Sequence, residues 1–521
     1  MAVNRVTMAA FASLTMPQSY IKRILNARIY DLAVETPLEF APLISERCQN
    51  QVWLKREDLQ PVFSFKIRGA YNKLLQLTPE QLAKGVVAAS AGNHAQGLAL
   101  AAAHLGVKAT IVMPRTTPAI KVNAVKRRGA TVELQGDSYD EAAAFAKQLV
   151  QQQGMVYIHP FDDPDVIAGQ GTVAMEILRQ HPHPLDAVFI PVGGGGLCAG
   201  MAAYIKYLRS DVKVFAVESE DSACLAAAMA SGERSVLSQV GLFADGIAVA
   251  QIGEETFRVL RECIDGVITV SSDEICAAIK DIFEDNRSIT EPAGAAALAG
   301  LKKYVAREGV SGQSFIAIDS GANTNFDRLR YISERTEISE NREAILAVTI
   351  PERPGSYLEF CTLLGRRAIT EFNYRFQNAQ ENAHIFVGLQ ISPERGDRQD
   401  LIQRLRQQGY EVTDLSDNEM AKLHIRHMVG GRAPGDLSDE LLMRFEFPER
   451  PGALLQFLTK LAGRWNISLF HYRNHGAAFG RVLVGMQVPA DSRQALITAL
   501  EELGYPFWDE SQNPAYRLFL A

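Results

Sequence analysis

The sequence predicts an α/β domain with a largely parallel sheet, followed by two smaller α+β modules of ferredoxin-like plan. Between about residues 50 and 330, short apolar runs such as ATIVMP, AVFIPV and KVFAVES alternate with helical stretches. This alternation is typical of a parallel sheet covered by helices. After residue 343, one pattern of strands and helices occurs twice. Ligands bind at the carboxyl ends of strands in parallel sheets, so the loops after the apolar runs are where we look for functional residues.

Composition excludes several classes of protein. The 521 residues are 47% hydrophobic and 22% charged, which excludes a mainly disordered or collagen-like chain. The net charge of −7 gives no electrostatic reason to bind nucleic acid or an anionic membrane, so we expect neither partner. The six cysteines include no C-x-x-C pair, which argues against a zinc ribbon and a secreted disulfide framework. We therefore expect a cytoplasmic protein without a metal site.

One uncharged segment requires a membrane check. The stretch from Ala187 to Ile205 carries no formal charge and is almost long enough to span a bilayer. It contains Pro191 and four consecutive glycines, which would break a transmembrane helix. We predict instead a buried strand, a glycine turn and a helix.

The first functional candidate is the segment SFKIRGA, residues 64–70, which opens a predicted helix after a strand and a loop. The helix dipole opposes a positive charge at this end and favours the neutral amine of Lys66. A neutral lysine amine can form a Schiff base with a carbonyl group. The alternative for this segment alone is an ordinary surface lysine in the first turn of a helix.

The second candidate is the segment SAGNHAQG, residues 90–97, which follows the predicted strand GVVAA. Its small residues let backbone N–H groups point outward at the start of a helix, an arrangement that suits a carboxylate. His94 has no second metal ligand at a sensible spacing, so we expect it to be a packed or capping residue rather than a metal ligand.

The third candidate is the glycine cluster Gly193–Gly196 with Leu197, again between a strand and a helix. Consecutive glycines allow several backbone N–H groups to approach one phosphate. No Gly-Lys-Ser/Thr sequence follows, which excludes a Walker loop. A dinucleotide-binding fingerprint remains open, and with it an NAD-dependent dehydrogenase. That alternative would use Gly194, Gly196, Ala199 and Glu218.

The segment SGAN, residues 320–323, follows the apolar run FIAI and on its own predicts only a turn. The polar, charge-dense stretch from Ser333 to Glu343 then marks a domain boundary. We expect a first domain over residues 1–335, a linker over 336–343, and two modules over 344–418 and 440–515.

The internal repeat defines the two modules. The sequence PERPG at 351–355 recurs at 448–452, an offset of 97 residues, and Tyr374-Arg375 recurs as Tyr472-Arg473. Each copy predicts strand, Pro-Gly turn, helix, strand, strand, helix and strand, which is a ferredoxin-like order. The alternative is a duplicated structural module that binds no ligand.

The segments SFKIRGA, SAGNHAQG, PVGGGGL and SGAN together resemble the fold-type II pyridoxal-phosphate-dependent family of serine and threonine dehydratases. With the duplicated module, nearly the whole chain resembles the biosynthetic threonine ammonia-lyases of that family, and the repeat resembles their ACT-like regulatory modules. The resemblance implies a tryptophan synthase β-like catalytic domain, pyridoxal 5′-phosphate as cofactor and a homotetramer. Two departures stand out: Asp319 replaces an expected apolar residue, and EPAGA at 291–295 has Ala where Ser is frequent.

The resemblance implies conversion of L-threonine to 2-oxobutyrate and ammonia by loss of water, the first step of isoleucine synthesis. Lys66 would form the Schiff base and act as general base, Asn93 would contact the cofactor's ring hydroxyl, and Ser320 would meet its ring nitrogen. The cofactor phosphate would lie on Gly193, Gly194, Gly195, Gly196 and Leu197. The substrate carboxylate would lie on Ser90, Ala91, Gly92, Asn93 and His94. An L-serine dehydratase or a racemase remains an alternative within the family.

For the repeat, the resemblance implies inhibition by isoleucine and opposition by valine. An aromatic ring can cover an aliphatic side chain, and an arginine can pair with a carboxylate. The candidate effector contacts are Tyr374, Arg375, Tyr472 and Arg473. The alternative is that both tyrosines are core residues of strands.

Overall fold

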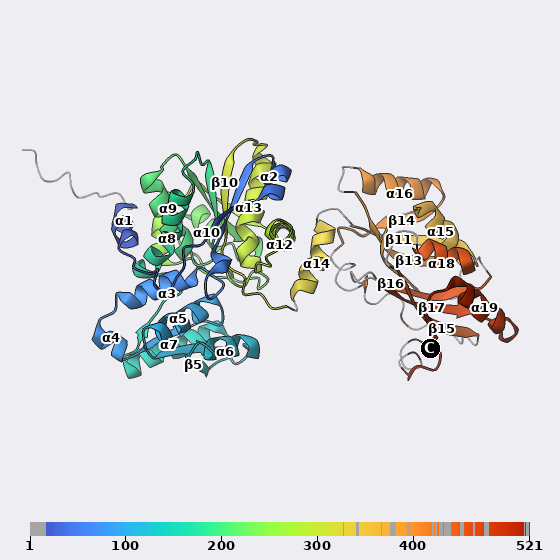
Figure 1. Cartoon of the computed structure of the whole chain (residues 1–521), viewed down its shortest axis with the longest axis horizontal. Helices are drawn as coiled ribbons and strands as arrows, with labels where there is room; N and C mark the ends of the chain where they lie inside the picture. The colour runs from blue at the N-terminus through green and yellow to red at the C-terminus, as the bar shows by residue number, and fades with distance from the viewer. Residues whose placement is uncertain are drawn as a thin grey trace, which may run out of the picture. The chain divides into compact units, whose positions relative to one another are not determined.

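A computed structural model describes most of the chain as two compact units, Met1–Thr336 and Glu337–Ala521 (Figure 1). The described residues are 17–326, 328–339, 343–365, 367–375, 382–392, 396–418, 421, 425–426, 431, 439–448, 453–461, 464–473, 479–514, 516 and 520.

The larger sheet of the first unit has six strands in the order β1-β2-β10-β7-β8-β9. All neighbours are parallel except β1, which runs antiparallel to β2. The strands are β1 (Leu38–Phe40), β2 (Gln51–Arg56), β7 (Ala187–Pro191), β8 (Lys213–Ser219), β9 (Gly266–Val270) and β10 (Ser314–Asp319). The parallel sheet predicted from the alternating pattern is confirmed.

Alternate side chains of these strands enter two different cores. Val188 and Ile190 of β7 pack in one core with residues of helices α8 (Pro164–Gln180) and α9 (Gly196–Leu208). Ala187 and Phe189 pack in the other core with residues of α12 (Ser272–Asn286) and α13 (Pro292–Glu308). Helices therefore cover both faces, which explains why these strands are almost continuously apolar. Further helices are α1 (Pro17–Leu25), α2 (Pro42–Cys48), η2 (Glu57–Leu59), η3 (Glu220–Ser222), α10 (Cys224–Ser231) and α11 (Glu254–Cys263).

A second, four-stranded parallel sheet in the same unit has the order β5-β4-β3-β6. Its strands are β3 (Val86–Ala89), β4 (Ala109–Met113), β5 (Thr131–Leu134) and β6 (Val156–Tyr157). The alternating pattern did not indicate that the strands divide between two sheets. The helices from this part of the chain are α3 (Lys66–Leu75), α4 (Pro79–Ala83), α5 (Asn93–His104), α6 (Ala119–Lys126) and α7 (Tyr139–Gln153).

The uncharged stretch from Ala187 to Ile205 folds as predicted, into strand β7, a glycine turn and helix α9. Among the described residues, no helix has the length and apolar character needed to cross a membrane. Helix α14 (Arg328–Ser339) crosses the expected domain boundary and runs into the first part of the expected linker.

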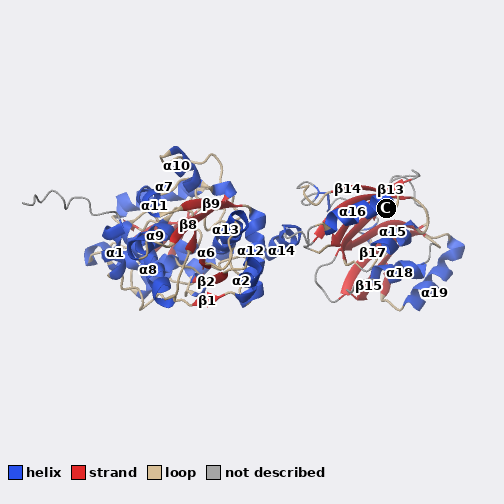
Figure 2. Ribbon diagram, turned by 90° about the horizontal axis from the view of Figure 1, so that it is seen from above, coloured by secondary structure: helices blue, strands red, loops and turns tan. Residues whose placement is uncertain are grey.

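The C-terminal unit contains one eight-stranded sheet, in the order β14-β11-β13-β12-β16-β17-β15-β18 (Figure 2). Each repeat supplies four strands and two helices in the predicted ferredoxin-like order. The first copy contains β11 (Glu343–Pro351), α15 (Ser356–Leu364), β12 (Ile369–Arg375), β13 (Asn382–Gln390), α16 (Asp397–Gln407) and β14 (Glu411–Asp414). The second contains β15 (Glu440–Pro448), α18 (Ala453–Leu461), β16 (Asn466–Arg473), β17 (Phe479–Gln487), η5 (Ala490–Ser492), α19 (Arg493–Leu503) and β18 (Phe507–Asp509).

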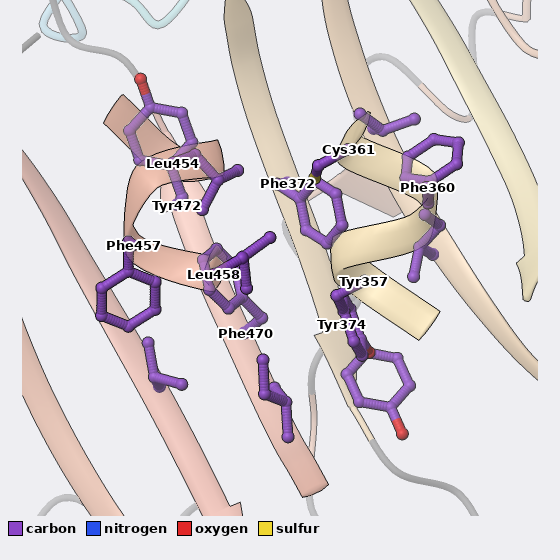
Figure 3. Packing of buried hydrophobic residues seen from close by; sticks show 14 of the residues in the cluster. Tyr357, Phe360, Cys361, Phe372, Tyr374, Leu454, Phe457, Leu458, Phe470 and Tyr472 are labelled. Atoms are coloured by element: carbon purple, nitrogen blue, oxygen red, sulfur yellow. The ribbon is translucent and has the colours of Figure 1, made fainter. Parts of the chain in front are cut away.

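The two repeats are joined through their equivalent strands β12 and β16, which pair antiparallel. Asn373 faces His471, its own counterpart in the repeat, so this pair lies at the centre of the junction. The Phe372 and Phe470 rings meet across the junction at 5.3 Å between centroids, and Figure 3 shows them beside Phe360 and Phe457 of helices α15 and α18. One apolar core thus runs through both repeats.

Candidate active site

Lys66 is the first residue of helix α3 and is partly buried. Its Nζ atom donates a hydrogen bond to the carbonyl oxygen of Pro160 at 3.2 Å. Desolvation lowers the pKa of the Lys66 amine to about 8, while the negative charge of Glu291 acts in the opposite direction. An amine with this pKa is partly neutral near pH 8 and can attack a carbonyl carbon.

The segment before Lys66 is held against the turn that contains Ser320. Ser64 pairs with Gly321 in an isolated antiparallel bridge. The Phe65 N–H donates to the carbonyl oxygen of Ser320 at 3.3 Å, and the Ala322 N–H donates to that of Phe63 at 2.9 Å. Two motifs that lie about 250 residues apart in the sequence are therefore neighbours in space, at the carboxyl ends of β2 and β10.

The glycine cluster forms a tight turn between β7 and α9 that leaves no room for side chains. A Cβ atom on Gly193 would lie 2.9 Å from the Ile247 Cα atom, and one on Gly194 would overlap the Phe161 ring. Gly195 has φ 92°, where L side chains are rare. The N-terminal N–H groups of α9 have no partners within the helix, so this turn has the geometry to bind a phosphate closely.

Asn93 is the first residue of α5, and its side-chain amide is held at both ends. Its Nδ2 atom donates to Glu291 Oε1 at 2.6 Å, and its Oδ1 atom accepts from Asn323 Nδ2 at 2.7 Å. Glu291 is buried, and desolvation, with help from the negative charge of Asp245, raises the pKa of its carboxyl to about 7. Sequence reasoning did not identify Glu291 as a functional residue, because the segment EPAGA at 291–295 stands out only for having Ala where Ser is frequent.

The segment Ser90–His94 runs into the first turn of α5, which begins at Asn93, and contains no cationic group. The Ser90 Oγ atom accepts from the Gly92 N–H at 3.3 Å. The His94 Nε2 atom lies 2.9 Å from the Ile158 carbonyl oxygen and must donate to it. Burial and the nearby Lys66 lower the pKa of His94 to about 3, so its ring is neutral at physiological pH. An anion on this loop would be held by backbone N–H groups at the start of α5 rather than by histidine charge.

Ser320 follows strand β10 and is buried, with its Oγ atom 3.4 Å from the Ala293 carbonyl oxygen. Burial and the charge of Asp58 raise the pKa of the neighbouring Asp319 well above its ordinary value. The Thr290 Oγ1 atom lies 2.6 Å from Asp319 Oδ1 and 2.7 Å from the Gly321 carbonyl oxygen. The Thr290 hydroxyl thus lies between the Asp319 carboxyl and the turn at Gly321, and the Arg56 Nε atom lies 3.8 Å from the other carboxyl oxygen of Asp319. Asp319 therefore supports the turn that carries Ser320.

The candidate effector residues lie on the paired strands of the C-terminal unit. Tyr374 and Tyr472 are buried, and the Tyr374 hydroxyl donates to Glu352 Oε2. The buried Arg375 guanidinium contacts both carboxylate oxygens of Glu440 and donates to the Leu520 carbonyl oxygen at 2.6 Å. The Arg473 side chain lies outside the described residues. An effector carboxylate would have to compete with Glu440 for Arg375, and the effector assignment stays a prediction.

Among the residues described, no group of three or more His, Cys, Asp or Glu side chains could hold a metal ion. The residues present do fit pyridoxal phosphate. A lysine amine with a lowered pKa opens α3, a glycine turn excludes side chains at the start of α9, and a buried serine follows β10.

Comparisons with known proteins agree with this chemistry. Residues 29–321 match the family described as pyridoxal-phosphate dependent enzyme. Residues 334–425 and 431–520 each match the family described as C-terminal regulatory domain of threonine dehydratase. The chain is 56% identical to the biosynthetic L-threonine dehydratase of Burkholderia multivorans, over 96% of this chain and 99% of the relative. It is also 56% identical to the enzyme of that name from Escherichia coli, over 96% and 97%.

Solved structures resemble the first unit. The processed form of threonine deaminase isoform 2 from Solanum lycopersicum has a TM-score of 0.60 and 47% identity, over 61% of this chain and 93% of that chain. Serine racemase from Dictyostelium discoideum has a TM-score of 0.55 and 36% identity, over 59% and 99%. The fold and the site define a pyridoxal-phosphate-dependent enzyme of fold type II. Within that class, the chain belongs to the family of biosynthetic L-threonine dehydratases with a duplicated regulatory domain.

This family membership removes the NAD-dependent dehydrogenase from consideration. Glu218, which that alternative would use to bind a ribose, is the second-last residue of β8 and is buried. Its carboxylate oxygens accept the N–H groups of Leu225 and Ala226, each at 2.8 Å. The Glu218 side chain therefore has a structural role at the start of α10.

Proposed function

We propose that this protein converts L-threonine to 2-oxobutyrate and ammonia by pyridoxal-phosphate-dependent loss of water. The observation that carries the proposal is the Lys66 amine, which has a lowered pKa and opens α3 in a chain of the threonine dehydratase family. The experiment that tests it is 2-oxobutyrate formation from L-threonine by the purified protein with cofactor. Absence of turnover with the cofactor present would contradict it.

Each motif has a role in this proposal. When bound, pyridoxal phosphate supplies an electron sink for the bond that breaks at the substrate Cα atom. The neutral Lys66 amine takes the α-proton. The loop of Ser90, Ala91, Gly92, Asn93 and His94 orients the substrate by its carboxylate. The turn of Gly193, Gly194, Gly195, Gly196 and Leu197 would hold the cofactor phosphate. Asn93 would contact the ring hydroxyl, and Ser320, which carries no charge, would contact the ring nitrogen.

Replacement of Lys66 should separate chemistry from folding. In Lys66→Ala, we expect turnover to fall by at least about a thousandfold, because the group that moves the α-proton is gone. We also expect the absorbance of the cofactor Schiff base to disappear. Lys73→Ala is the matched control on the same helix, because Lys73 pairs with Asp163 at 2.8 Å and Asp165 at 3.0 Å instead. Near-normal turnover in Lys66→Ala would refute the assignment.

Serine chemistry is the second candidate, because the first unit also resembles serine racemases, at 36% identity for the Dictyostelium discoideum structure. The two C-terminal matches to the threonine dehydratase regulatory domain favour threonine. The measurement is kcat/KM for L-threonine against L-serine, together with chiral analysis of remaining serine. We expect the higher kcat/KM for threonine, and rapid formation of D-serine would favour a racemase instead.

We further infer that isoleucine inhibits the enzyme and that valine opposes this inhibition, through modules 344–418 and 440–515. The matched regulatory domains support effector control, and Tyr374, Arg375, Tyr472 and Arg473 are the proposed contacts. Isoleucine titrated into the threonine assay should lower turnover, and added valine should restore it. Turnover that is indifferent to isoleucine would leave the modules without this ligand.

We also infer a catalytic domain over 1–335, a linker over 336–343 and a cytoplasmic homotetramer. The assembly and location are carried only by the resemblance to the family. Sedimentation equilibrium of the holoenzyme measures the assembly directly, and a mass other than four chains would contradict the tetramer.

A further inference from the structure

The carboxylate of Asp245 joins three elements that are distant in the sequence. Asp245 lies in the loop between α10 and α11 and is about one-third exposed. Its Oδ2 atom accepts from the Nζ atom of Lys121, on α6, at 2.8 Å. Its Oδ1 atom accepts from the Nη1 atom of Arg328, the first residue of α14, at 3.3 Å. One side chain thus connects α6 of the four-stranded sheet region with the helix that leads into the C-terminal unit.

The two residues after Asp245 lie directly against the active site. A Cβ atom on Gly246 would lie 3.3 Å from Glu291 Oε1 and 3.8 Å from Asn93 Nδ2. The Ile247 backbone lies so close to Gly193 that a side chain on that glycine would meet it at 2.9 Å. A shift of the Asp245 loop would therefore change the packing of both the glycine turn and the Glu291–Asn93 pair.

The same junction acts on the site through charge. Among the causes that set the pKa of Glu291, the negative charge of Asp245 raises it and the positive charge of Lys121 lowers it. The Glu291 carboxyl in turn affects the pKa of Lys66. A change in the pairing of Asp245 therefore changes the electrostatic environment of the Lys66 amine, in addition to the packing around the site.

Helix α14 is attached to this loop by its first turn. Arg328 Nη1 also donates to the Phe243 carbonyl oxygen at 3.0 Å, and the Phe243 ring contacts the Tyr331 ring at 5.3 Å between centroids. The helix continues to Ser339, beyond Thr336, where the first compact unit ends. Any movement of α14 that accompanies a change in the C-terminal unit therefore acts on the Arg328–Asp245 contact.

We propose that Asp245 is a positioning residue that links α14, and through it the C-terminal unit, to the glycine turn and the Glu291–Asn93 pair. In this arrangement the inhibitory state of the C-terminal unit withdraws Arg328 from Asp245. The Asp245 loop then moves away from Gly193, which Ile247 contacts, and the charge near Glu291 changes. The proposal rests on the proposed function, because it takes the glycine turn as the cofactor phosphate site and the C-terminal unit as regulatory.

Two arginines of α14 provide a matched test. Arg328→Gln breaks the contact with Asp245. Arg335→Gln breaks an ion pair with Asp273 at the start of α12 and a hydrogen bond to the Tyr331 hydroxyl, but it leaves the Arg328–Asp245 contact in place. The first measurement is the rate at which each full-length holoenzyme releases pyridoxal phosphate into a trap, with the absorbance spectrum of the bound cofactor. We expect release from Arg328→Gln to be up to about fivefold faster than from the wild type, as loss of one partly exposed ion pair allows. Arg335→Gln should release at the wild-type rate, and Arg328→Lys should partly restore it.

The second measurement is isoleucine inhibition of the same proteins at saturating cofactor. Arg328→Gln should need at least about fivefold more isoleucine for half-inhibition, while Arg335→Gln should respond as the wild type does. Equal cofactor release from both variants would overturn the proposal, whatever isoleucine does. Faster release from Arg328→Gln with unchanged inhibition would overturn the regulatory route. If the wild type is not inhibited at all, the proposed effector fails, and faster release from Arg328→Gln alone still supports the positioning role of Asp245.

Discussion

At the scale of single residues, the site contains a partly buried lysine and a buried glutamate whose pKa values are shifted towards each other. Desolvation lowers the pKa of Lys66 to about 8 and raises that of Glu291 to about 7. Both shifts have the same cause, because burial disfavours the charged form of each group. The lowered pKa of Lys66 allows a neutral amine to exist near physiological pH, which a general base at the substrate Cα atom requires.

Replacement of Glu291 should lower the pKa of Lys66. Glu291→Gln keeps an oxygen that can accept from Asn93 but removes the negative charge that stabilises the ammonium form. In the protein without cofactor, the rate of Schiff base formation should rise with pH through a midpoint near 8. In Glu291→Gln we expect the midpoint to fall by roughly one pH unit, because the opposite charge is lost. Absorbance kinetics with added pyridoxal phosphate, over about three pH units centred near 8, measures this midpoint.

Glu218→Gln is the matched control for this experiment. Glu218 is also a buried glutamate whose pKa is raised to about 7 by desolvation, but its carboxylate binds backbone N–H groups of α10. Its replacement should leave the midpoint unchanged. A common midpoint for the wild type and Glu291→Gln would show that Glu291 does not set the Lys66 pKa.

At the scale of elements, the glycine turn between β7 and α9 depends on both conformation and space. Gly195 combines φ 92° with a close approach, since a Cβ atom there would lie 2.9 Å from Ile252 and Thr256. The left-handed conformation alone costs a non-glycine residue about 1 kcal/mol. The close approach adds a steric cost that cannot be relieved without moving α11, which begins at Glu254 and contains Thr256.

Gly195→Ala should therefore weaken cofactor binding as well as stability. We expect the Kd for pyridoxal phosphate to rise by at least about tenfold, because the turn must move to admit the methyl group. Gly232→Ala is the control, since Gly232 has φ 78° and no neighbouring atom within 4 Å. It should cost about 1 kcal/mol of stability and leave the Kd unchanged. Fluorescence titration of the apoprotein measures both constants, and equal Kd values would refute the role of the turn.

The elements were predictable where a local pattern determines them. The apolar runs around Ala187 and Ser314 are strands because both faces of that sheet are covered, and the repeat reproduced the order of elements in both modules. The site was only partly predictable. Nothing near Glu291 in the sequence indicates its contact with Asn93, since that contact depends on how the fold brings the start of α13 to the start of α5. The division into two sheets depends on the same long-range packing.

At the scale of the whole molecule, the two repeats are not independent domains. Strands β12 and β16 pair through five residues on each side, and the core passes from one repeat to the other. The buried Arg375–Glu440 ion pair also connects the first repeat to the second. Breaking such a pair by removing one partner leaves an uncompensated buried charge. We therefore expect the repeats to unfold together.

The cores of the two compact units are separate. Every buried residue in the clusters of the first unit lies between Tyr20 and Ile332, and the large core of the second begins at Ala344. Calorimetry of the full chain should therefore show two transitions. Pyridoxal phosphate should raise the unfolding free energy of the first unit only, by about 2.7 kcal/mol at a hundred times its Kd, because a ligand stabilises only the unit that binds it.

Core variants assign the two transitions. Phe457 lies in the core of the second unit. Phe457→Ala should lower the unfolding free energy of that unit only, by about 3–5 kcal/mol for a buried phenylalanine, and so shift the transition that the cofactor leaves unchanged. Phe189→Ala, in the first core, should lower only the cofactor-sensitive transition. One transition that responds to the cofactor and to both variants would mean that the units unfold as one. In that case helix α14, which continues from the first unit beyond Thr336, would be the element that couples their folding.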